Sequence, residues 1–245
     1  FNIYIIKVDN GSLYLVPNYL GNLSNYEFHK SVKKVINNIQ YFIFENEKPG
    51  RAFIKAINPE KNQAELIIST LNKFTKKEST KDFLKPCFQG NDIALISDAG
   101  CPGIADPGAD LVSIAHLKKI KVIPLVGPSS IFLALMASGM NGQQFDFNGY
   151  LSIDKKKRRE EIKIMEKKSN LVTQIFMETP YRNDKLIIDL INYLKPLTRL
   201  CIATDITLEN ELIKTDTIEN WKNNKEIYNK RPSIFIIESI NFDYR

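Results

Sequence analysis

A strand-like segment, Asp92–Ser97, runs directly into a loop that holds three glycines and two prolines, Asp98–Gly108. A helix is expected immediately afterwards, over Ala109–Lys118. Loops at the carboxyl ends of strands are where open α/β sheets bind ligands. Glycine lets the backbone approach a ligand closely, and proline fixes the shape of the loop. The alternative is a tight connection of ordinary turn residues, but the length of this loop and its repeated glycines and prolines favour ligand binding.

The rest of the chain alternates apolar runs with helix-like segments, a pattern typical of α/β folds with parallel sheets. In the first half, elements are expected at Leu13–Val16, Phe28–Ile39, Tyr41–Phe44, Arg51–Ile57, Leu66–Ser69, Val122–Val126 and Ser129–Ala137. In the second half, they are expected at Phe147–Leu151, Lys155–Lys168, Thr173–Met177, Asn183–Leu194, Leu200–Thr204 and Ile234–Ile237. Gly139 and Gly142 interrupt the pattern, which predicts two α/β domains, residues 1–138 and 139–245.

Several common kinds of site have no counterpart in the sequence. The motifs GxGxxG and GK[ST] are absent, which argues against the usual NAD-binding and phosphate-binding loops. The three cysteines have no CxxC partner, and the two histidines, His29 and His116, offer little for a metal site or a Ser-His-Asp triad. We therefore expect no metal, and chemistry that needs no histidine base.

The net charge of +6 is compatible with an anionic partner such as RNA, although the abundance of Lys, Asn and Ile produces a similar balance without one. The longest apolar runs are strand-sized. The opening segment Phe1–Val8 lacks the basic region and the cleavage site of a signal peptide. These features predict a cytoplasmic protein that does not enter a membrane.

A second strand-to-helix junction, Leu125–Ser130, is built like the first. Either Ser129 or Ser130 could cap the helix by accepting backbone N–H bonds. A ligand contact at this junction would be an addition to capping rather than a rival to it.

Taken in order, SDAGCPGIADPG, PLVGPSS, MASGM and FNGYL resemble motifs of the tetrapyrrole-methylase-like methyltransferases. The resemblance is closest to the branch that methylates a ribose 2′-oxygen in small-subunit ribosomal RNA. Leu13–Val16 with Gly21-Asn22-Leu23 is similar to the first strand and loop of that branch, and Thr173–Arg182 to its segment after the domain boundary. The resemblance implies two α/β domains with a cleft between them for S-adenosylmethionine, and a homodimer.

The resemblance also implies site residues. Carried across by motif, the cofactor-binding positions are Leu20, Asp98, Ala99, Gly100, Cys101, Ser129, Ser130, Met177, Asp205 and Pro232. A sulfonium methyl group is already activated, so the protein mainly has to orient donor and acceptor. An oxygen acceptor must still lose a proton, for which Glu45 and Glu178 are candidates. Arg182, beside Tyr181, completes the candidate catalytic residues as a clamp for an anionic acceptor, with capping of the next helix as the alternative.

The chain departs from the RNA-methylating branch on the acceptor side. It has Glu45-Asn46-Glu47-Lys48, with Arg51 slightly later, where the branch has Glu-Asp-Thr-Arg, and Ala203–Thr207 where the branch has Arg-Glu-Leu-Thr-Lys. A C-terminal extension common in the branch is not expected after Ile237. These departures leave open a tetrapyrrole or other small-molecule acceptor, and a non-catalytic paralogue that binds the cofactor. The run Lys155–Arg159 is either an RNA-binding patch or a solvated helix start, since Glu160, Glu161 and Glu166 follow it.

Overall fold

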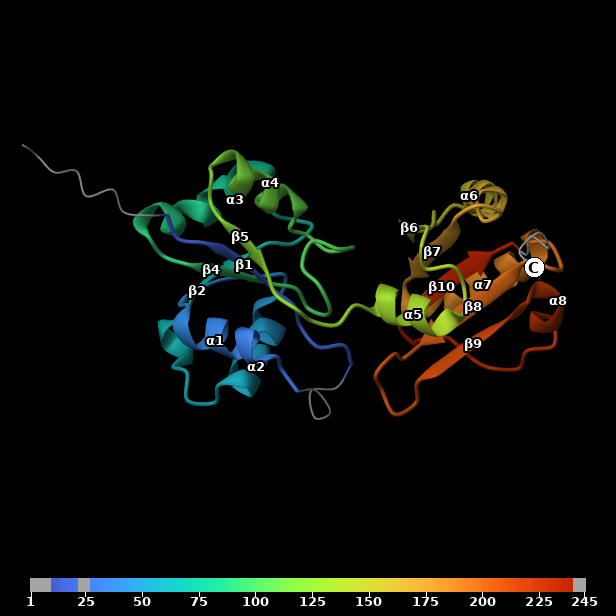
Figure 1. The fold of residues 1–245 in the computed structure, drawn as a ribbon, viewed down its shortest axis with the longest axis horizontal. Coiled ribbons are helices and arrows are strands. Elements are labelled where there is room, and N and C mark those ends of the chain that lie inside the picture. The colour runs from blue at the N-terminus through green and yellow to red at the C-terminus, as the bar shows by residue number, and fades with distance from the viewer. Residues whose placement is uncertain (1–9, 22–26, 240–245) are drawn as a thin grey trace, which may run out of the picture. The chain divides into compact units, whose positions relative to one another are not determined.

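The computed structural model describes residues 10–21 and 27–239, which form two compact units, Phe1–Ser129 and Ser130–Arg245 (Figure 1). The opening segment Phe1–Val8 and the pair Asn22-Leu23 of the first-loop resemblance lie outside the described residues. Within the described part, no helix is both long and apolar enough to span a membrane. A two-domain α/β fold, as predicted, is confirmed.

The first unit is built on a five-stranded parallel sheet with the strand order β3-β2-β4-β1-β5. Its strands are β1 (Leu13–Val16), β2 (Tyr41–Phe44), β3 (Ile67–Thr70), β4 (Ile93–Ile96) and β5 (Val122–Pro124). Its helices are α1 (Lys30–Asn38), α2 (Glu47–Ile57), α3 (Lys77–Thr80) and α4 (Ala109–Leu117), with the 3₁₀ segments η2 (Gln63–Glu65) and η3 (Lys81–Gln89). The sequence analysis did not predict α3, η2 or η3.

Alternate side chains along these short strands enter two separate cores. Phe42 and Phe44 of β2 pack with Phe53 and Ile54 of α2 on one face of the sheet. Ile43, between them in the strand, belongs to the core on the other face together with residues of α4 and η3. Figure 1 shows α1 and α2 on one side of the sheet and α3 and α4 on the other. Burial on both faces explains why the strands read as continuous apolar runs.

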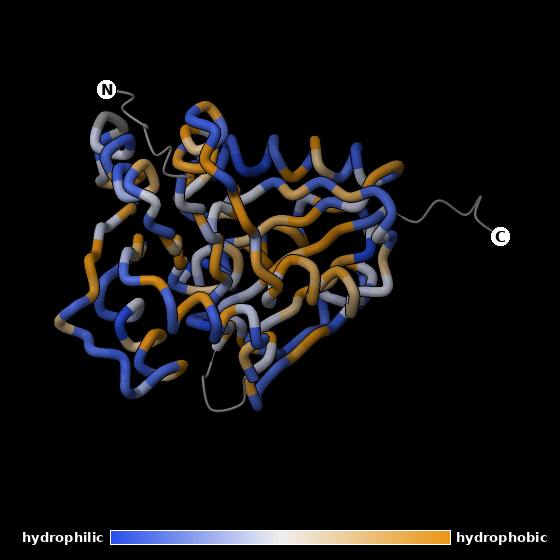
Figure 2. Tube along the Cα trace, turned by 60° about the vertical axis from the view of Figure 1, so that its left-hand side comes forward, coloured by the Kyte–Doolittle hydropathy of each residue, from blue (hydrophilic) through white to orange (hydrophobic). Residues whose placement is uncertain are grey.

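The second unit holds a mixed five-stranded sheet with the order β6-β7-β10-β8-β9. Its strands are β6 (Phe145–Tyr150), β7 (Thr173–Glu178), β8 (Arg199–Thr204), β9 (Leu212–Thr217) and β10 (Ser233–Glu238). Its helices are α5 (Ser130–Ser138), α6 (Lys155–Lys168), α7 (Asn183–Tyr193) and α8 (Ile218–Trp221), with the 3₁₀ segment η4 (Pro180–Arg182). Figure 2 shows hydrophobic colours concentrated along the strands and hydrophilic colours along outer helices and turns.

The expectation of parallel sheets fails in this second unit. Strand β10 is antiparallel to both β7 and β8, and β9 is antiparallel to β8. The sequence analysis did not predict β9, because its Lys214 and Asp216 make it look like a polar connection. As an edge strand paired on one side only, it stays half-exposed and tolerates these charges.

Helix α5 packs on the sheet of the second unit. Ile131, Ala134 and Leu135 join a core cluster with Ile175 of β7 and Ile236 of β10. The division between the compact units therefore comes before this helix, whereas the sequence placed the domain boundary after it, at residues 138 and 139. The two positions differ because α5 is apolar on nearly every side, so its sequence does not indicate which sheet it covers.

Candidate cofactor and acceptor site

In the first unit, the predicted site residues gather at the carboxyl edge of the sheet. Parallel pairing aligns Val16 of β1, Phe44 of β2 and Ile96 of β4, so the segments that follow these three strands emerge at one edge. Leu20 follows β1, Glu45 follows β2, and the loop that starts at Asp98 follows β4. The prediction that the Gly-and-Pro-rich loop lies at a strand's carboxyl end is confirmed.

Asn18, which the sequence analysis missed, ties two of these loops together. Its backbone N–H donates to the carbonyl of Gly100 at 2.9 Å, and its buried amide donates to the carbonyls of Ser97 and Asp98 at 2.9 and 3.0 Å. Ser97 Oγ donates to the carbonyls of Ala99 and Gly100, both at 3.2 Å. The turn is thereby held from both sides. A polar residue two positions after the apolar run Leu13–Val16 was the available signal.

Two glycines permit this arrangement. Gly100 is buried and adopts φ +68°, a conformation that suits glycine and strains other residues. Gly127 lies so close to Pro17 that a Cβ atom at residue 127 would stand 2.1 Å from the Pro17 ring. The two strand-to-helix junctions also meet each other directly, since the Cys101 thiol donates to the carbonyl of Pro128 at 3.4 Å. Ser129, half-exposed, follows immediately and ends the first unit.

Three carboxyl groups, those of Glu45, Asp98 and Asp106, share this edge, and the pKa values of Glu45 and Asp106 reflect it. Burial raises the pKa of Asp106 to about 7, and the carboxylates of Glu45 and Asp98 add to the effect. Burial and Asp98 also raise the pKa of Glu45, opposed by a hydrogen bond from the Asp98 backbone. Asp98 itself is exposed and accepts a 2.5 Å hydrogen bond from the Asn46 amide. No described arginine or lysine forms an ion pair with these three acids.

Asp106 also lines a pocket that belongs entirely to the first unit. The pocket has a volume of about 330 Å³ and lies between the segment after β3 and the start of α4. Asn72, Lys73 and Thr75 line one wall, and Asp106 through Leu111 the other. The sequence analysis overlooked Asp106 because an aspartate in a loop is ordinarily solvated. The signal it offered was its place inside the Gly-and-Pro-rich loop.

In the second unit, Met177, Glu178, Asp205 and Pro232 also meet at one edge of a sheet. Ser233 at the start of β10 pairs with Glu178 of β7 on one side and with Thr204 of β8 on the other. The carboxyl ends of β7 and β8 therefore flank the amino end of β10. The Asp205 N–H donates to the carbonyl of Pro232 at 2.9 Å. Ser130, at the start of α5, is half-exposed in the same unit.

Both acids at this second edge are held by arginines. Glu178 is buried, forms an ion pair with Arg182, and accepts the Thr179 N–H at 2.6 Å. Arg182 Nε also donates to Thr179 Oγ1 at 3.1 Å, so the guanidinium is fixed at the start of α7. Tyr181 beside it is largely exposed. Glu178 thus acts here as the anchor of Arg182.

Asp205 has the same kind of environment. It is buried, adopts φ +51°, and accepts hydrogen bonds from Arg231 Nε at 2.6 Å and from the Asn210 amide at 2.5 Å. Arg231 is a further residue that the sequence analysis did not single out. Because the carboxylate and the N–H of Asp205 are both engaged, this residue shapes the turn after β8.

The charge of the first edge matches a positively charged ligand. S-adenosylmethionine carries a sulfonium and an ammonium group, and Asp98 with the Glu45–Asp106 pair offers carboxylates to both. Gly100 keeps the turn free of a side chain at the point where the backbone faces Leu20. The residues present therefore fit such a cofactor. Within the described residues, no group of three or more His, Cys, Asp or Glu side chains could hold a metal ion.

Comparisons with known proteins agree with these features. The pattern of the family described as tetrapyrrole (corrin/porphyrin) methylases matches residues 33–221. A protein of Buchnera aphidicola (subsp. Schizaphis graminum), named ribosomal RNA small subunit methyltransferase I, is 33% identical over 232 residues, or 93% of this chain and 78% of the relative. The Bacillus subtilis protein of that name is 28% identical over 224 residues, or 90% of this chain and 73% of the relative.

Solved structures show the same architecture. The methyltransferase CobJ superposes with a TM-score of 0.63 at 11% identity, over 94% of each chain. A uroporphyrin-III-C-methyltransferase from Thermus thermophilus superposes with a TM-score of 0.53 at 15% identity, over 94% of this chain and 92% of the other. At these identities the likeness concerns the fold alone.

Proposed function

The chain belongs to the tetrapyrrole (corrin/porphyrin) methylase family and is an S-adenosylmethionine-dependent methyltransferase, and on that premise we propose that it methylates a ribose 2′-oxygen in small-subunit ribosomal RNA. The observation that carries the proposal is the 33% identity, across 93% of the chain, to a relative named for small-subunit ribosomal RNA. The charge of +6 suits a polyanionic acceptor.

The proposal assigns cofactor-binding residues within each unit. In the first unit these are Leu20, Asp98, Ala99, Gly100, Cys101 and Ser129, and in the second Ser130, Met177, Asp205 and Pro232. When bound, the cofactor supplies a methyl group that is already activated by its sulfonium. The chain's own contribution is to bind the cation, to orient the acceptor and to exclude water.

The Gly100→Val substitution tests this assignment. A β-branched residue at φ +68° distorts the turn between Asp98 and Cys101, so S-adenosylmethionine binding should fall below detection in calorimetry. Gly90→Val is the matched control, because Gly90 also has a positive φ, of +80°, but lies at the end of η3. Normal cofactor affinity in the Gly100 variant, with the control equally folded, contradicts the assignment.

We propose the Glu45–Asp106 pair as the proton acceptor. A ribose hydroxyl must lose its proton as the new O–C bond forms, and a base works best with a pKa near the working pH. The raised pKa values of Glu45 and Asp106 support this role. Glu178 is the weaker candidate, since an arginine already holds its carboxylate. Arg182, still partly exposed, is proposed to orient an anionic acceptor.

Two further proposals concern the state of the protein. We propose that the protein is a homodimer, as the family resemblance implies and because two-fold dimers are the commonest symmetric oligomers. We also propose that it is located in the cytoplasm. Light scattering on the purified protein tests whether it is a homodimer, and a monomer mass at micromolar concentration would count directly against this proposal.

The experiment that tests the function is transfer of labelled methyl from S-adenosylmethionine to small ribosomal subunits that lack the modification. The expected product, after digestion of the RNA, is one labelled 2′-O-methylnucleoside. Tetrapyrroles serve as competing acceptors in parallel reactions. Labelling of a tetrapyrrole without RNA overturns the proposal in favour of a small-molecule acceptor. No labelling at all, with the cofactor still bound, favours a non-catalytic paralogue.

A further inference from the structure

Several charged side chains of α6 lie on its inner face, where they bond to neighbouring segments of the second unit. Arg158 is buried and forms an ion pair with Asp189 of α7 at 2.5 Å, while it donates to the carbonyls of Ser152 and Ile153. Glu166 is buried and accepts from the Lys195 N–H at 2.5 Å and the Thr198 hydroxyl at 2.7 Å. Glu161 accepts from the Ser152 N–H at 2.8 Å. Two of the three acids in this helix therefore serve its attachment to the second unit.

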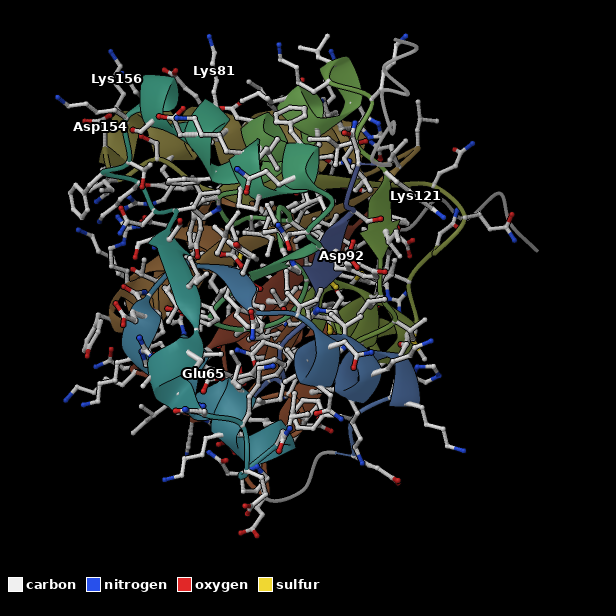
Figure 3. All side chains as sticks on the ribbon, turned by 90° about the vertical axis from the view of Figure 1, so that its left-hand side faces the viewer. Glu65, Lys81, Asp92, Lys121, Asp154 and Lys156 are labelled. Atoms are coloured by element: carbon white, nitrogen blue, oxygen red, sulfur yellow. The ribbon has the colours of Figure 1, made fainter. Side chains whose placement is uncertain are left out.

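What remains on the outer face is a dense set of cations. Seven exposed basic residues share this helix with one exposed acid, Glu160. The seven are Lys155, Lys156, Lys157, Arg159, Lys163, Lys167 and Lys168. Lys156, Lys163 and Lys167 follow one row at i, i+7 and i+11, the side opposite the buried residues. In Figure 3, Asp154 and Lys156 lie at the periphery, and the Lys156 side chain extends away from the ribbon.

This arrangement is unfavourable for an isolated helix. Lys155, Lys156 and Lys157 occupy the first turn, where the helix dipole disfavours positive charge and where no acidic residue is present. Like charges four residues apart, at Lys155–Arg159, Arg159–Lys163 and Lys163–Lys167, repel each other, and Glu160 is the one exposed acid among them. Within the described residues, ion pairs relieve this repulsion at Lys168 alone, through Asp146 at 3.8 Å. A polyanion along the outer face would remove both costs.

We propose that the outer face of α6 docks the phosphate backbone of the acceptor RNA. The inference rests on the proposed function, which supplies RNA as the partner, and its own evidence is the charge left exposed when Arg158, Glu161 and Glu166 turn inward. A helix of 14 residues is about 21 Å long, room for several successive phosphates. The Arg158–Asp189 pair fixes the rotation of the helix, so the row faces one direction. The surface contributes affinity and register, while base identity is read elsewhere.

The test compares two triple variants of the full chain. One, Lys156→Gln/Lys163→Gln/Lys167→Gln, removes three charges from the outer row of α6. The matched control, Lys33→Gln/Lys34→Gln/Lys55→Gln, removes three exposed charges from α1 and α2 of the first unit. The measurements are the Kd for RNA extracted from small ribosomal subunits as a function of salt, the Kd for S-adenosylmethionine, and the KM and kcat of methyl transfer.

For the α6 variant we expect RNA affinity to fall roughly 100-fold near 0.1 M salt and the log–log salt slope to flatten by about 2. KM for RNA should rise, while kcat at saturation and cofactor affinity stay as in the unmodified protein. The control should change little. Equal salt slopes in the two variants overturn the inference, even if the unmodified protein methylates RNA. Failure of the unmodified protein to methylate RNA, with the difference in slopes intact, rejects the proposed function and leaves the docking surface standing.

Discussion

The acidic residues at the two sheet edges that carry the predicted site residues have opposite electrostatic surroundings. At the edge of the first unit, Glu45, Asp98 and Asp106 have no cationic partner among the described residues, and burial raises the pKa of Asp106 to about 7. At the edge of the second unit, Glu178 pairs with Arg182 and Asp205 with Arg231. At the first edge burial raises the pKa of both Asp106 and Glu45, whereas at the second edge the ion pairs of Glu178 and Asp205 with arginines organise the backbone.

This difference separates two roles that the sequence could not separate. Glu45 and Glu178 both follow or end a strand, and both were candidate bases. Their neighbours distinguish them: another carboxylate, Asp98, lies beside Glu45, and a guanidinium holds Glu178. The first edge is therefore suited to bind a cation and to take up a proton, and the second to fix the position of an arginine.

The largest expected effect is on stability, and it separates the two edges directly. Asp205→Asn keeps a residue type that tolerates the positive φ but leaves Arg231 without its anion, so unfolding free energy should fall by about 3 kcal/mol. Asp98→Asn, at the exposed first edge, should cost about 0.5 kcal/mol or less. Urea unfolding of both variants measures the contrast. Equal losses would show that the two edges do not differ as described.

A smaller effect concerns cofactor affinity and pH. A bound cation favours the ionised form of a nearby carboxyl, so the affinity for S-adenosylmethionine should rise as the pH increases through about 7, where Asp106 loses its proton. The demethylated product carries the same amino and carboxyl groups but no sulfonium. The affinity for S-adenosylmethionine, divided by the affinity for the demethylated product, should therefore rise about tenfold between pH 6 and pH 8. Calorimetry with both ligands tests this, and a ratio independent of pH would remove the acids from the cofactor site.

Much of the fold followed from periodicity, and the exceptions have physical causes. Apolar runs located β1, β2, β4, β7, β8 and β10 because these strands are buried. Strand β9 was missed because an edge strand tolerates polar residues, and η3 because Pro86 interrupts its helical pattern. Whether β10 runs parallel or antiparallel depends on its neighbours, which local sequence does not encode.

The site was predictable to a similar extent. The Gly-and-Pro-rich loop could be predicted, because three glycines and two prolines after a buried strand have few structural explanations. The ion pairs could not be predicted, because Asp205 and Arg231, like Arg158 and Asp189, are far apart in sequence and are brought together only by tertiary packing. The elevated pKa of Asp106 likewise depends on burial and on two nearby acids, Glu45 after β2 and Asp98 at the start of the same loop.

The central claim, that the first edge supplies the proton acceptor, is tested most directly by the pH dependence of methyl transfer in the unmodified protein and in Asp106→Asn. The measured quantity is kcat/KM for the cofactor at saturating RNA, with Glu60→Gln, an exposed acid elsewhere in the first unit, as the control. In the unmodified protein the rate should rise with pH through an apparent pKa near 7 and then level off, because the Glu45–Asp106 pair accepts a proton only when ionised. In Asp106→Asn that rise should disappear and the rate at pH 8 should fall about 100-fold. An unchanged rate with the same apparent pKa in Asp106→Asn would contradict the account.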